Sequence, residues 1–294
     1  MEGTYEKITK IGIGILLLSF IVLIGYLKIN DHITQNDQEK TLTSKKVKQE
    51  DLKTNEPVII DGNWSSYFNG LNGSAVICDP SANQYQIYNQ ELAHTRQSPC
   101  STFKIISSLI GLENGIIDPQ NSVRKWNNEI FWNEQWNRDI DFFNAFRNSC
   151  VWYFRQVIDE IGPDMMQKEL EKLKYGNCDI SDWSGKLNTN NDNPLLTGFW
   201  IESSLLISPK EQVEVMEHIF GDDTDYSQET VEQLKQVMLL SELNDEDTLI
   251  YGKTGMGKDY GITADSWFTG FCKSDNKKVL FFSTRYLTVL KRSV

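Results

Sequence analysis

The pattern of apolar and polar residues divides the chain into three parts, of which the first is the most apolar. Ile11–Leu27 is a run of seventeen residues without a charge, with Lys7 and Lys10 before it and Lys28 after it. This length lies at the short end for a membrane-spanning helix and at the long end for the core of a signal peptide. No small-x-small cleavage motif follows the run, so we expect residues 1–30 to form an uncleaved signal-anchor, with a cleaved signal segment as the alternative.

The second part, residues 31–56, is almost devoid of large apolar residues. A segment with so little apolar surface to bury cannot form a core, so we expect a flexible polar linker. The third part, residues 57–294, contains the apolar patterns of a folded domain. The lysines before the first part favour an N-terminus inside the cell, which places the domain on the extracytoplasmic face of the membrane, or outside the cell if the segment is cleaved.

The folded part begins with strand signals and continues with a very apolar helix. Ser74–Asn89 is typical of two short strands joined by a Pro-Ser-Ala-Asn turn. A helix follows, for which Ser98 suits the N-cap, Pro99 the first helical position and Asn114–Gly115 the end. Apolar residues occupy almost every side of this helix, which predicts a central, buried position.

Helices dominate the middle of the domain, from about Asn121 to Ser241, and strands return after it. Ser208–Glu211 predicts a helix start with a capping box and a proline at its first position. Ser266–Lys273 and Lys278–Leu287 predict an antiparallel hairpin. We therefore expect an α/β fold of the α+β type, in which an antiparallel sheet formed from both ends of the domain is flanked by helices and carries a mostly helical subdomain.

Composition and charge narrow the possible functions. The 294 residues include 29 Lys and Arg against 41 Asp and Glu, which gives a net charge of −12. Because a nucleic acid requires basic patches to neutralise its phosphates, we expect no nucleic-acid partner. The five cysteines are too scattered for a disulfide framework and the three histidines show no metal-ligand spacing, so we expect no metal site.

Ser101 and Lys104 are the first residues with candidate chemistry. On a helix that starts at Ser98 they share one face, with the serine in the first turn and the lysine one turn later. A serine hydroxyl becomes a nucleophile when a base takes its proton, and a lysine can be that base if burial keeps its amine neutral. The first turn also offers free backbone N–H groups to a developing oxyanion. By itself, Ser-x-x-Lys is a weak signal, because two polar residues on an ordinary helix give the same pattern by chance in many proteins.

Two further motifs follow in order along the chain. Ser149–Val151 (Ser-Cys-Val) places a polar serine in an otherwise apolar run. Lys253–Gly255 (Lys-Thr-Gly) lies in an expected strand, where the lysine and threonine can bind an anionic substrate and the glycine lets a ligand approach the backbone closely. Ser-x-x-Lys, Ser-x-Val and Lys-Thr-Gly in this order form a variant of the motif set of penicillin-recognising serine enzymes.

From about Asn63 to about Thr284 the chain resembles a class D (oxacillinase-type) serine β-lactamase. The resemblance rests on SPCSTFKI (Ser98–Ile105), SCV (Ser149–Val151), KYGN (Lys174–Asn177), FWIESSLLISPKEQV (Phe199–Val213) and YGKTG (Tyr251–Gly255). The Tyr-Gly-Asn triplet and the Phe-Trp-x-Glu stretch separate class D from class A enzymes and from transpeptidases. The resemblance implies the β-lactamase/transpeptidase fold and hydrolysis of β-lactams through an acyl-enzyme.

Three residues acquire catalytic roles from this resemblance. Ser101 opens the β-lactam ring, and Ser149 passes a proton towards the leaving nitrogen. Lys104 reacts with carbon dioxide to form a carbamate (N6-carboxylysine), which acts as general base for acylation and deacylation. Since only a neutral amine attacks carbon dioxide, this role requires an apolar pocket. The resemblance implies no cofactor other than carbon dioxide or bicarbonate.

The resemblance also implies residues that bind the substrate or shape the site. Val151 keeps the pocket of the lysine apolar, and the indole N–H of Trp200 bonds the carbamate. The lysine and threonine of Lys-Thr-Gly bind the carboxylate side of the substrate, and two backbone N–H groups, of Ser101 and Met256, form the oxyanion hole. Tyr175–Asn177 is expected to shape the wall of the site. The substrate-binding or site-shaping residues are then Val151, Trp200, Lys253, Thr254, Gly255 and Met256.

The C-terminal end departs from the family pattern. The family continues after its last long strand with a helix that packs on the sheet, and an arginine in that region contacts the substrate carboxylate. Only about ten residues follow FFST here, so we expect the domain to lack this helix, with a loss of stability or of substrate affinity. Arg285 follows the strand, and the sequence does not show whether it takes the place of the family's arginine.

Two functions stay open. The first is a membrane-tethered hydrolase whose partners are the cytoplasmic membrane and β-lactam antibiotics: penicillins and cephalosporins, with carbapenems as a further candidate. The alternative is a β-lactam-binding sensor or penicillin-binding protein that is acylated without efficient turnover. Such sensors carry several membrane helices and a zinc-protease module, whereas this sequence has one hydrophobic segment and no His-Glu-x-x-His. Val151 counts against a cell-wall transpeptidase.

Overall fold

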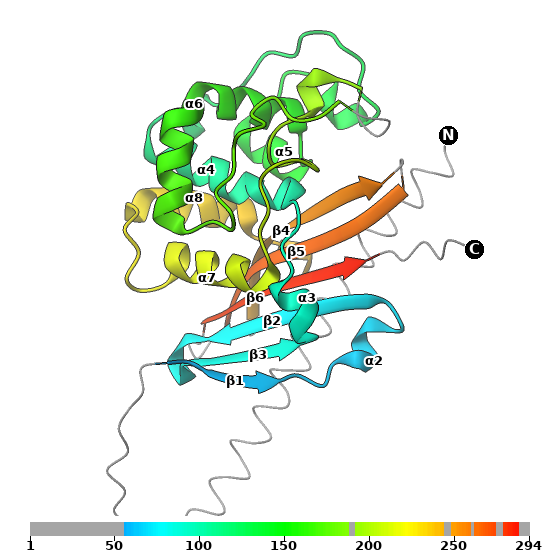
Figure 1. Ribbon diagram of the computed structural model, residues 1–294. Helices are drawn as coiled ribbons and strands as arrows, with labels where there is room; N and C mark the ends of the chain where they lie inside the picture. The colour runs from blue at the N-terminus through cyan, green and yellow to red at the C-terminus, as the bar shows by residue number, and fades with distance from the viewer. Residues whose placement is uncertain (1–55, 188–191, 244–247, 260–261, 275–278, 288–294) are drawn as a thin grey trace, which may run out of the picture.

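The computed structural model describes residues 56–187, 192–243, 248–259, 262–274 and 279–287, which form a sheet and a helical layer (Figure 1). The strands are β1 (Val58–Asp61), β2 (Asn72–Asp79), β3 (Gln84–Tyr88), β4 (Thr248–Asp259), β5 (Ile262–Ser274) and β6 (Val279–Leu287). The α-helices are α2 (Ser65–Phe68), α3 (Gln90–His94), α4 (Lys104–Glu113), α5 (Phe142–Arg147), α6 (Val151–Leu173), α7 (Pro209–Phe220) and α8 (Gln228–Met238). Short 3₁₀ helices are η1 (Pro80–Ala82), η2 (Cys100–Phe103), η3 (Pro119–Asn121), η4 (Glu134–Trp136), η5 (Pro194–Leu196) and η6 (Ser241–Leu243).

The sheet joins strands from both ends of the folded part. Its order is β1-β3-β2-β6-β5-β4, and every neighbouring pair is antiparallel except β1 with β3. The two halves meet where β2 pairs with β6, with Val76 opposite Ser283. The predicted hairpin is formed by β5 and β6, in which Phe271 lies opposite Phe281. The predicted α+β fold, with a sheet made from both ends and a mostly helical subdomain, is therefore confirmed (Figure 1).

Helix α4 is the central helix of the helical layer. All residues of Lys104–Leu112 are buried, and the helix packs against α6 and α8. Its end is as predicted, since Asn114 is the C-cap and Gly115 has a φ of 68°, a left-handed conformation that suits glycine. The apolar residues on almost every side of the helix thus have the buried position that the sequence indicated.

The start of this helix differs from the prediction. Cys100–Phe103 forms the 3₁₀ turn η2, and α4 begins only at Lys104. Ser98 does not cap the helix, because its hydroxyl donates to the carbonyl of Trp200 (2.8 Å) and accepts from the N–H of Glu202 (2.8 Å). The predicted α-helical start at Ser98 and Pro99 is wrong, because a loop distant in the sequence uses the side chain that local pattern assigns to the cap.

Helix α7 lies between the sheet and the other helices and starts as the sequence predicts (Figure 1). The Ser208 hydroxyl accepts from the N–H of Glu211, and the Glu211 carboxylate accepts from the N–H of Ser208. Pro209 occupies the first helical position, so the predicted capping box is confirmed. The helix packs on β2 and β6, which fixes the helical layer to the centre of the sheet.

Some predictions fall outside the described residues. Ile11–Leu27, nearly all of the linker 31–56 and the residues after Leu287 are in this group. Within the ranges that the structure describes, no helix is both long and apolar enough to cross a membrane. The boundaries 1–30, 31–56 and 57–294 stay predictions.

Candidate active site

The candidate nucleophile lies where the start of α4 meets the edge strand β4. The amine of Lys104 donates to the hydroxyl of Ser101, with Nζ and Oγ 2.9 Å apart. The turn that carries Ser101 is closed by Thr102, whose N–H (3.1 Å) and hydroxyl (2.8 Å) both donate to the carbonyl of Pro99. Gln212 of α7 donates in turn to the Thr102 hydroxyl (3.1 Å). The Ser101 hydroxyl is therefore held beside the Lys104 amine by a buried network.

The surroundings of Lys104 are apolar. Lys104 is 1 % exposed, and its amine lies 5.5 Å from the centre of the Phe154 ring. Burial lowers the pKa of Lys104 from 10.5 to about 8, because desolvation disfavours the ammonium. Burial also raises the pKa of the neighbouring Cys150 thiol to about 12, so this thiol stays uncharged. The Lys104 amine is therefore much more easily deprotonated than a free lysine, and in its neutral form it can accept the proton of Ser101.

A second hydroxyl reaches the same place from the segment between α5 and α6. Ser149 lines the same cavity as Ser101, and its backbone is in the left-handed region with a φ of 54°. Its Oγ is buried and has no hydrogen-bond partner among the described residues. Because an unpaired buried hydroxyl costs free energy, a substrate atom that bonds it would relieve that cost.

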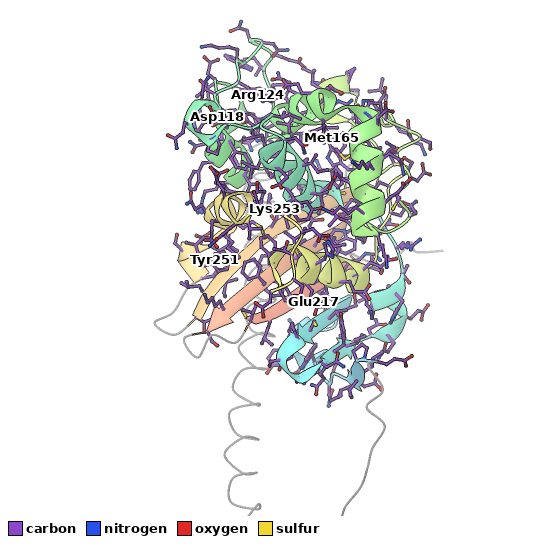
Figure 2. The ribbon with its side chains drawn as sticks, turned by 90° about the vertical axis from the view of Figure 1, so that its left-hand side faces the viewer. Asp118, Arg124, Met165, Glu217, Tyr251 and Lys253 are labelled. Carbon is purple, nitrogen blue, oxygen red and sulfur yellow. The ribbon has the colours of Figure 1, made fainter. Side chains whose placement is uncertain are left out.

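Strand β4 contributes a second buried amine. Lys253 is 6 % exposed, and its Nζ donates to the carbonyl of Thr254 (3.2 Å). Burial and the nearby charge of Lys104 lower the pKa of Lys253 to about 7. Figure 2 shows Lys253 at the boundary between the sheet and the helical layer. The two amines thus lie close enough for the charge of one to favour the neutral form of the other.

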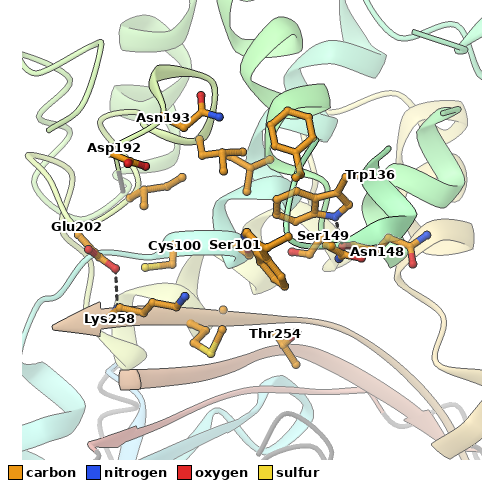
Figure 3. A pocket seen from close by; sticks show the side chains of 18 of the residues that line it. Cys100, Ser101, Trp136, Asn148, Ser149, Asp192, Asn193, Glu202, Thr254 and Lys258 are labelled. Atoms are coloured by element: carbon orange, nitrogen blue, oxygen red, sulfur yellow. Dashed lines mark hydrogen bonds between the residues drawn. The ribbon is translucent and has the colours of Figure 1, made fainter. Parts of the chain in front are cut away.

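A cavity of about 470 Å³ lies between the Ser101 turn, the segment that carries Ser149, and strand β4 (Figure 3). This volume is in the range of sites that bind small organic molecules. The structure brings six of the residues predicted for the site together in its lining: Ser101, Ser149, Val151, Thr254, Gly255 and Met256.

Three predicted residues lie behind this lining. Lys104 contacts the cavity through Ser101, and Lys253 is buried with its amine 5.8 Å from the centre of the Phe146 ring. Trp200 is 1 % exposed, its ring stacks on Phe103 at 6.1 Å, and its carbonyl accepts from the N–H of Cys100 (2.9 Å). The structure thus gives Trp200 a supporting contact with the nucleophile turn, while a bond from its indole to a carbamate stays a prediction.

The Tyr175–Asn177 triplet also lies behind the wall that it was expected to form. Tyr175 is buried with its ring edge-on to Phe103 at 5.6 Å. The Asn177 side chain accepts from the N–H of Leu206 (2.9 Å) and donates to the carbonyl of Ser204 (2.8 Å). None of the triplet lines the cavity. Its contacts instead support the loop 198–206, which does reach the cavity.

Arg285 is paired within the sheet and does not line the cavity. Its Nε donates to Asp265 at 2.7 Å, its Nη1 donates to the carbonyl of Thr95 at 3.3 Å, and both charged side chains are buried. Breaking such a buried pair would leave an uncompensated charge inside the fold, so Arg285 stays paired with Asp265. Among the described residues that line the cavity, Lys258 is the cationic side chain.

Sequence reasoning missed the aromatic wall and the residues that face it. Ile130 and Trp132 line the cavity and are 76 % and 45 % exposed, and Trp132 packs on Trp136 with ring centres 5.0 Å apart. The amine of Lys258 lies 5.7 Å from the centre of the Trp132 ring. The segment around Trp132 has no apolar periodicity, and its richness in tryptophan was the one signal that could have indicated it.

The comparison with known proteins identifies the family. Residues 50–285 match the family described as penicillin binding protein transpeptidase domain. This chain belongs to the penicillin-binding transpeptidase family.

The relatives of this transpeptidase-family chain include both enzymes and regulators. The probable β-lactamase YbxI of Bacillus subtilis (strain 168) is 33 % identical over 220 residues, which cover 74 % of this chain and 76 % of YbxI. The regulatory protein BlaR1 of Bacillus licheniformis is 30 % identical over 220 residues, which cover 74 % of this chain and 34 % of BlaR1. The chain therefore spans only about a third of the length of that regulator.

Solved structures of this family show the same two groups. The C-terminal domain of the Bacillus licheniformis BlaR penicillin receptor matches with a TM-score of 0.69 at 28 % identity, covering 78 % of this chain and 88 % of that one. A class D β-lactamase from Bacillus subtilis matches with a TM-score of 0.64 at 31 % identity, covering 75 % and 86 %. The resemblance to class D β-lactamases that the sequence indicated is confirmed.

The close approach of β4 to the nucleophile turn gives a first testable prediction. A Cβ added at Gly255 would lie 2.9 Å from the carbonyl oxygen of Pro99 and 3.0 Å from Cγ2 of Thr102. Gly255→Ala must therefore push the strand away from the turn, and we expect the acylation rate with a chromogenic cephalosporin to fall about a hundredfold. Gly257→Ala is the control, because its Cβ meets nothing closer than 3.4 Å, and it should keep most of the activity. Equal rates in the two variants would contradict the prediction.

Proposed function

We propose that this chain is a serine β-lactamase of class D, a hydrolase that opens β-lactams through an acyl-enzyme on Ser101. The observation that carries the proposal is the 2.9 Å hydrogen bond between Lys104 Nζ and Ser101 Oγ, in surroundings that lower the pKa of the amine. A nucleophile and a base in hydrogen-bond contact beside a cavity form the arrangement required for covalent catalysis. The similarity to YbxI and to solved class D enzymes supports the same activity.

The acylation step assigns a task to each group in the cavity. The base at Lys104 takes the proton of Ser101 while Oγ bonds to the β-lactam carbonyl carbon, and the carbonyl oxygen becomes an oxyanion. The backbone N–H groups of Ser101 and Met256 stabilise that oxyanion. As the ring C–N bond breaks, the hydroxyl of Ser149 delivers a proton to the departing nitrogen and takes up in exchange the proton that the base at Lys104 received from Ser101. Water then attacks the acyl-enzyme, which releases the opened product and restores Ser101.

We also propose that Lys104 is carbamylated by carbon dioxide. The site fits this group, because the amine is buried beside Phe154, has a neutral fraction and has an uncharged Cys150 thiol as its neighbour. A carbamate bound there would supply a general base for both acylation and deacylation. Val151 at the start of α6 lines the adjoining cavity and adds an apolar contact.

For the substrate, we propose β-lactams whose carboxylate lies against Thr254 and Lys253. The Thr254 side chain lines the cavity, and the neighbouring Lys253 is buried and donates to the Thr254 carbonyl. Penicillins and cephalosporins carry their carboxylate on the ring fused to the β-lactam, within reach of this strand, and carbapenems are a further candidate class.

A second function is favoured by one specific observation. The penicillin-receptor domain of BlaR has a TM-score of 0.69, against 0.64 for the class D enzyme from Bacillus subtilis. A receptor of this kind would be acylated at Ser101 by the same steps and would keep the acyl group.

One experiment separates the two functions. The chain is mixed with a chromogenic cephalosporin, with and without added bicarbonate, and colour and protein mass are followed together. A hydrolase gives many turnovers that increase with bicarbonate, whereas a receptor gives one equivalent of colour and a lasting mass increase. Turnover indifferent to bicarbonate, with unmodified Lys104 in the mass spectrum, would contradict carbamylation.

For its location, we propose that the chain is held at the extracytoplasmic face of the membrane by Ile11–Leu27. The support is the uncharged run with lysines before it, together with the site of β-lactam action outside the cytoplasm. Proteolysis of intact cells should remove the folded part and leave cytoplasmic markers untouched. Protection from protease in intact cells would contradict this location.

A further inference from the structure

The loop 198–206 crosses the nucleophile turn and is bonded to it at buried positions. The Ser98 hydroxyl, 4 % exposed, donates to the carbonyl of Trp200 (2.8 Å) and accepts from the N–H of Glu202 (2.8 Å). The N–H of Cys100 also donates to the Trp200 carbonyl (2.9 Å). The residue directly before the nucleophile is thus fixed to this loop, and one serine side chain orients the backbone of Glu202.

The side chain of Glu202 connects the loop to strand β4. Its Oε1 accepts a hydrogen bond from the backbone N–H of Lys258 at 2.6 Å, which is drawn as a dashed line in Figure 3. Bonds to a carboxylate are shorter and stronger than bonds between neutral groups. The pairing of β4 with β5 shifts register between Gly257 and Lys258, so β4 is irregular at the residue that donates to Glu202. Glu202 therefore bonds the strand where its ladder is interrupted.

The backbone at both ends of this connection is unusual. Glu202 has a φ of 50° and Cys100 a φ of 49°, and neither is a glycine. Non-glycine residues adopt this region when surrounding contacts impose it, and such residues concentrate at functional sites. Here Glu202 is bonded to Ser98 through its N–H and to the Lys258 N–H through its carboxylate, and the N–H of Cys100 is bonded to the carbonyl of Trp200.

The connection spans the two elements that supply the oxyanion hole. One N–H is that of Ser101, next to Cys100, and the other is that of Met256, two residues before Lys258. The approach of β4 to the turn is limited on one side by Gly255, whose position leaves no room for a Cβ beside Pro99. On the other side, the bond from the Lys258 N–H to Glu202 joins the strand to the loop 198–206.

We propose that Glu202 is a positioning residue that sets the separation between the Ser101 turn and strand β4, and thereby the geometry of the oxyanion hole. This proposal rests on the proposed acylation of Ser101. Glu202 acts through the Lys258 N–H and does not exchange a proton with the substrate. The length of the side chain places its carboxylate oxygen where it accepts from the Lys258 N–H. A side chain of the same length that also ends in an acceptor oxygen should therefore replace it.

The test compares Glu202→Asp, Glu202→Gln and Glu202→Ala in single-turnover acylation by a chromogenic cephalosporin. Aspartate tolerates a left-handed φ better than glutamate, so Glu202→Asp should fold, yet it is one methylene too short to reach Lys258. We expect the maximal acylation rate to fall about a hundredfold in the Asp and Ala variants, with the half-saturating concentration changed less than about threefold. Glu202→Gln keeps an oxygen of the same reach and should stay within about fivefold of the unmodified chain.

The control is Glu214→Gln on the exposed side of α7, which makes the same charge change away from the cavity and should leave the rate unchanged. Acylation by Glu202→Asp at the rate of the unmodified chain would overturn the proposal. A Glu202→Gln variant as slow as Glu202→Ala would also overturn it, as would variants in which only the half-saturating concentration rises and the maximal rate is unchanged. If the unmodified chain gains no acyl mass at Ser101, the proposed function itself fails. The two failures can be told apart. If the unmodified chain is acylated normally but the variants behave otherwise than expected, only the proposal on Glu202 fails.

Discussion

Replacement of Ser101 by alanine should abolish covalent capture of β-lactams. Ser101 is the residue whose hydroxyl both lines the cavity and accepts a hydrogen bond from the buried Lys104 amine. Without Oγ no bond to the β-lactam carbonyl can form, and we expect the acylation rate to fall by about a thousandfold or more. Intact-protein mass after incubation with a penicillin measures the adduct, and release of colour from a chromogenic cephalosporin measures turnover.

The matched control for this variant is Ser108→Ala on α4, the helix that follows the Ser101 turn. Ser108 is fully buried, and its hydroxyl has no hydrogen-bond partner among the described residues. Removing such a hydroxyl leaves no partner unsatisfied, so acylation and stability should stay close to those of the unmodified chain. A persistent acyl adduct in the Ser101→Ala variant would mean that another group is the nucleophile, such as Ser149, which also lines the cavity.

The parts of the fold that the sequence predicted correctly are those with local signals. The capping box at Ser208 and the two C-terminal strands follow from residue types a few positions apart, and the structure confirms both. The buried position of α4 follows in the same way from apolar residues on almost every side. The arrangement of the three motifs around one cavity came from their resemblance to a family, since no local pattern indicates that Ser101, Ser149 and Thr254 meet.

The incorrect predictions arise where distant segments meet. Ser98 has the local signature of a helix cap, yet its hydroxyl bonds Trp200 and Glu202, and the turn that follows is a 3₁₀ turn. The bond between Glu202 and Lys258 joins residues 56 positions apart, and neither residue lies in a periodic pattern that would indicate the contact. Propensities describe each segment alone, whereas these conformations are selected by tertiary contacts.

The ion pair of Arg285 is another contact between distant segments that the sequence alone does not indicate. A sequence shows a cation near the end of a strand but not the partner that neutralises it. In the structure, Asp265 on the neighbouring strand pairs with Arg285 inside the fold. The pairing follows from the register of β5 and β6, which sequence analysis predicted as a hairpin without its register.

Replacement of Lys104 by methionine should abolish acylation and, at neutral pH, make the fold more stable. The amine is the base that contacts Ser101, so its loss should lower the acylation rate by at least about a hundredfold. Methionine has a similar length and fills the apolar surroundings beside Phe154 without burying an ammonium. With the pKa of Lys104 lowered to about 8, removal of the buried charge should raise the free energy of unfolding by about 3 kcal/mol at pH 7.

The pH dependence fixes the sign of this effect. The pKa of Lys104 is 10.5 for the free side chain and about 8 in the fold. Below about pH 8 the lysine is protonated in both states, and the folded chain bears the whole cost of the buried ammonium. Between these two values the unfolded chain binds more protons, so the stability of the unmodified chain rises with pH. The advantage of the methionine variant should therefore be largest below pH 8 and disappear by about pH 10.5.

Urea unfolding of both chains across this pH range, in buffers freed of carbon dioxide so that the amine is unmodified, measures the difference directly. Lys235→Met on α8 is the control, since its amine pairs with Glu232 at the surface and should change stability little at any pH. A Lys104→Met variant less stable than the unmodified chain at pH 7 would mean that the lysine charge is compensated in the fold. A compensated ammonium keeps its proton at neutral pH, so the amine could then neither take the proton of Ser101 nor react with carbon dioxide.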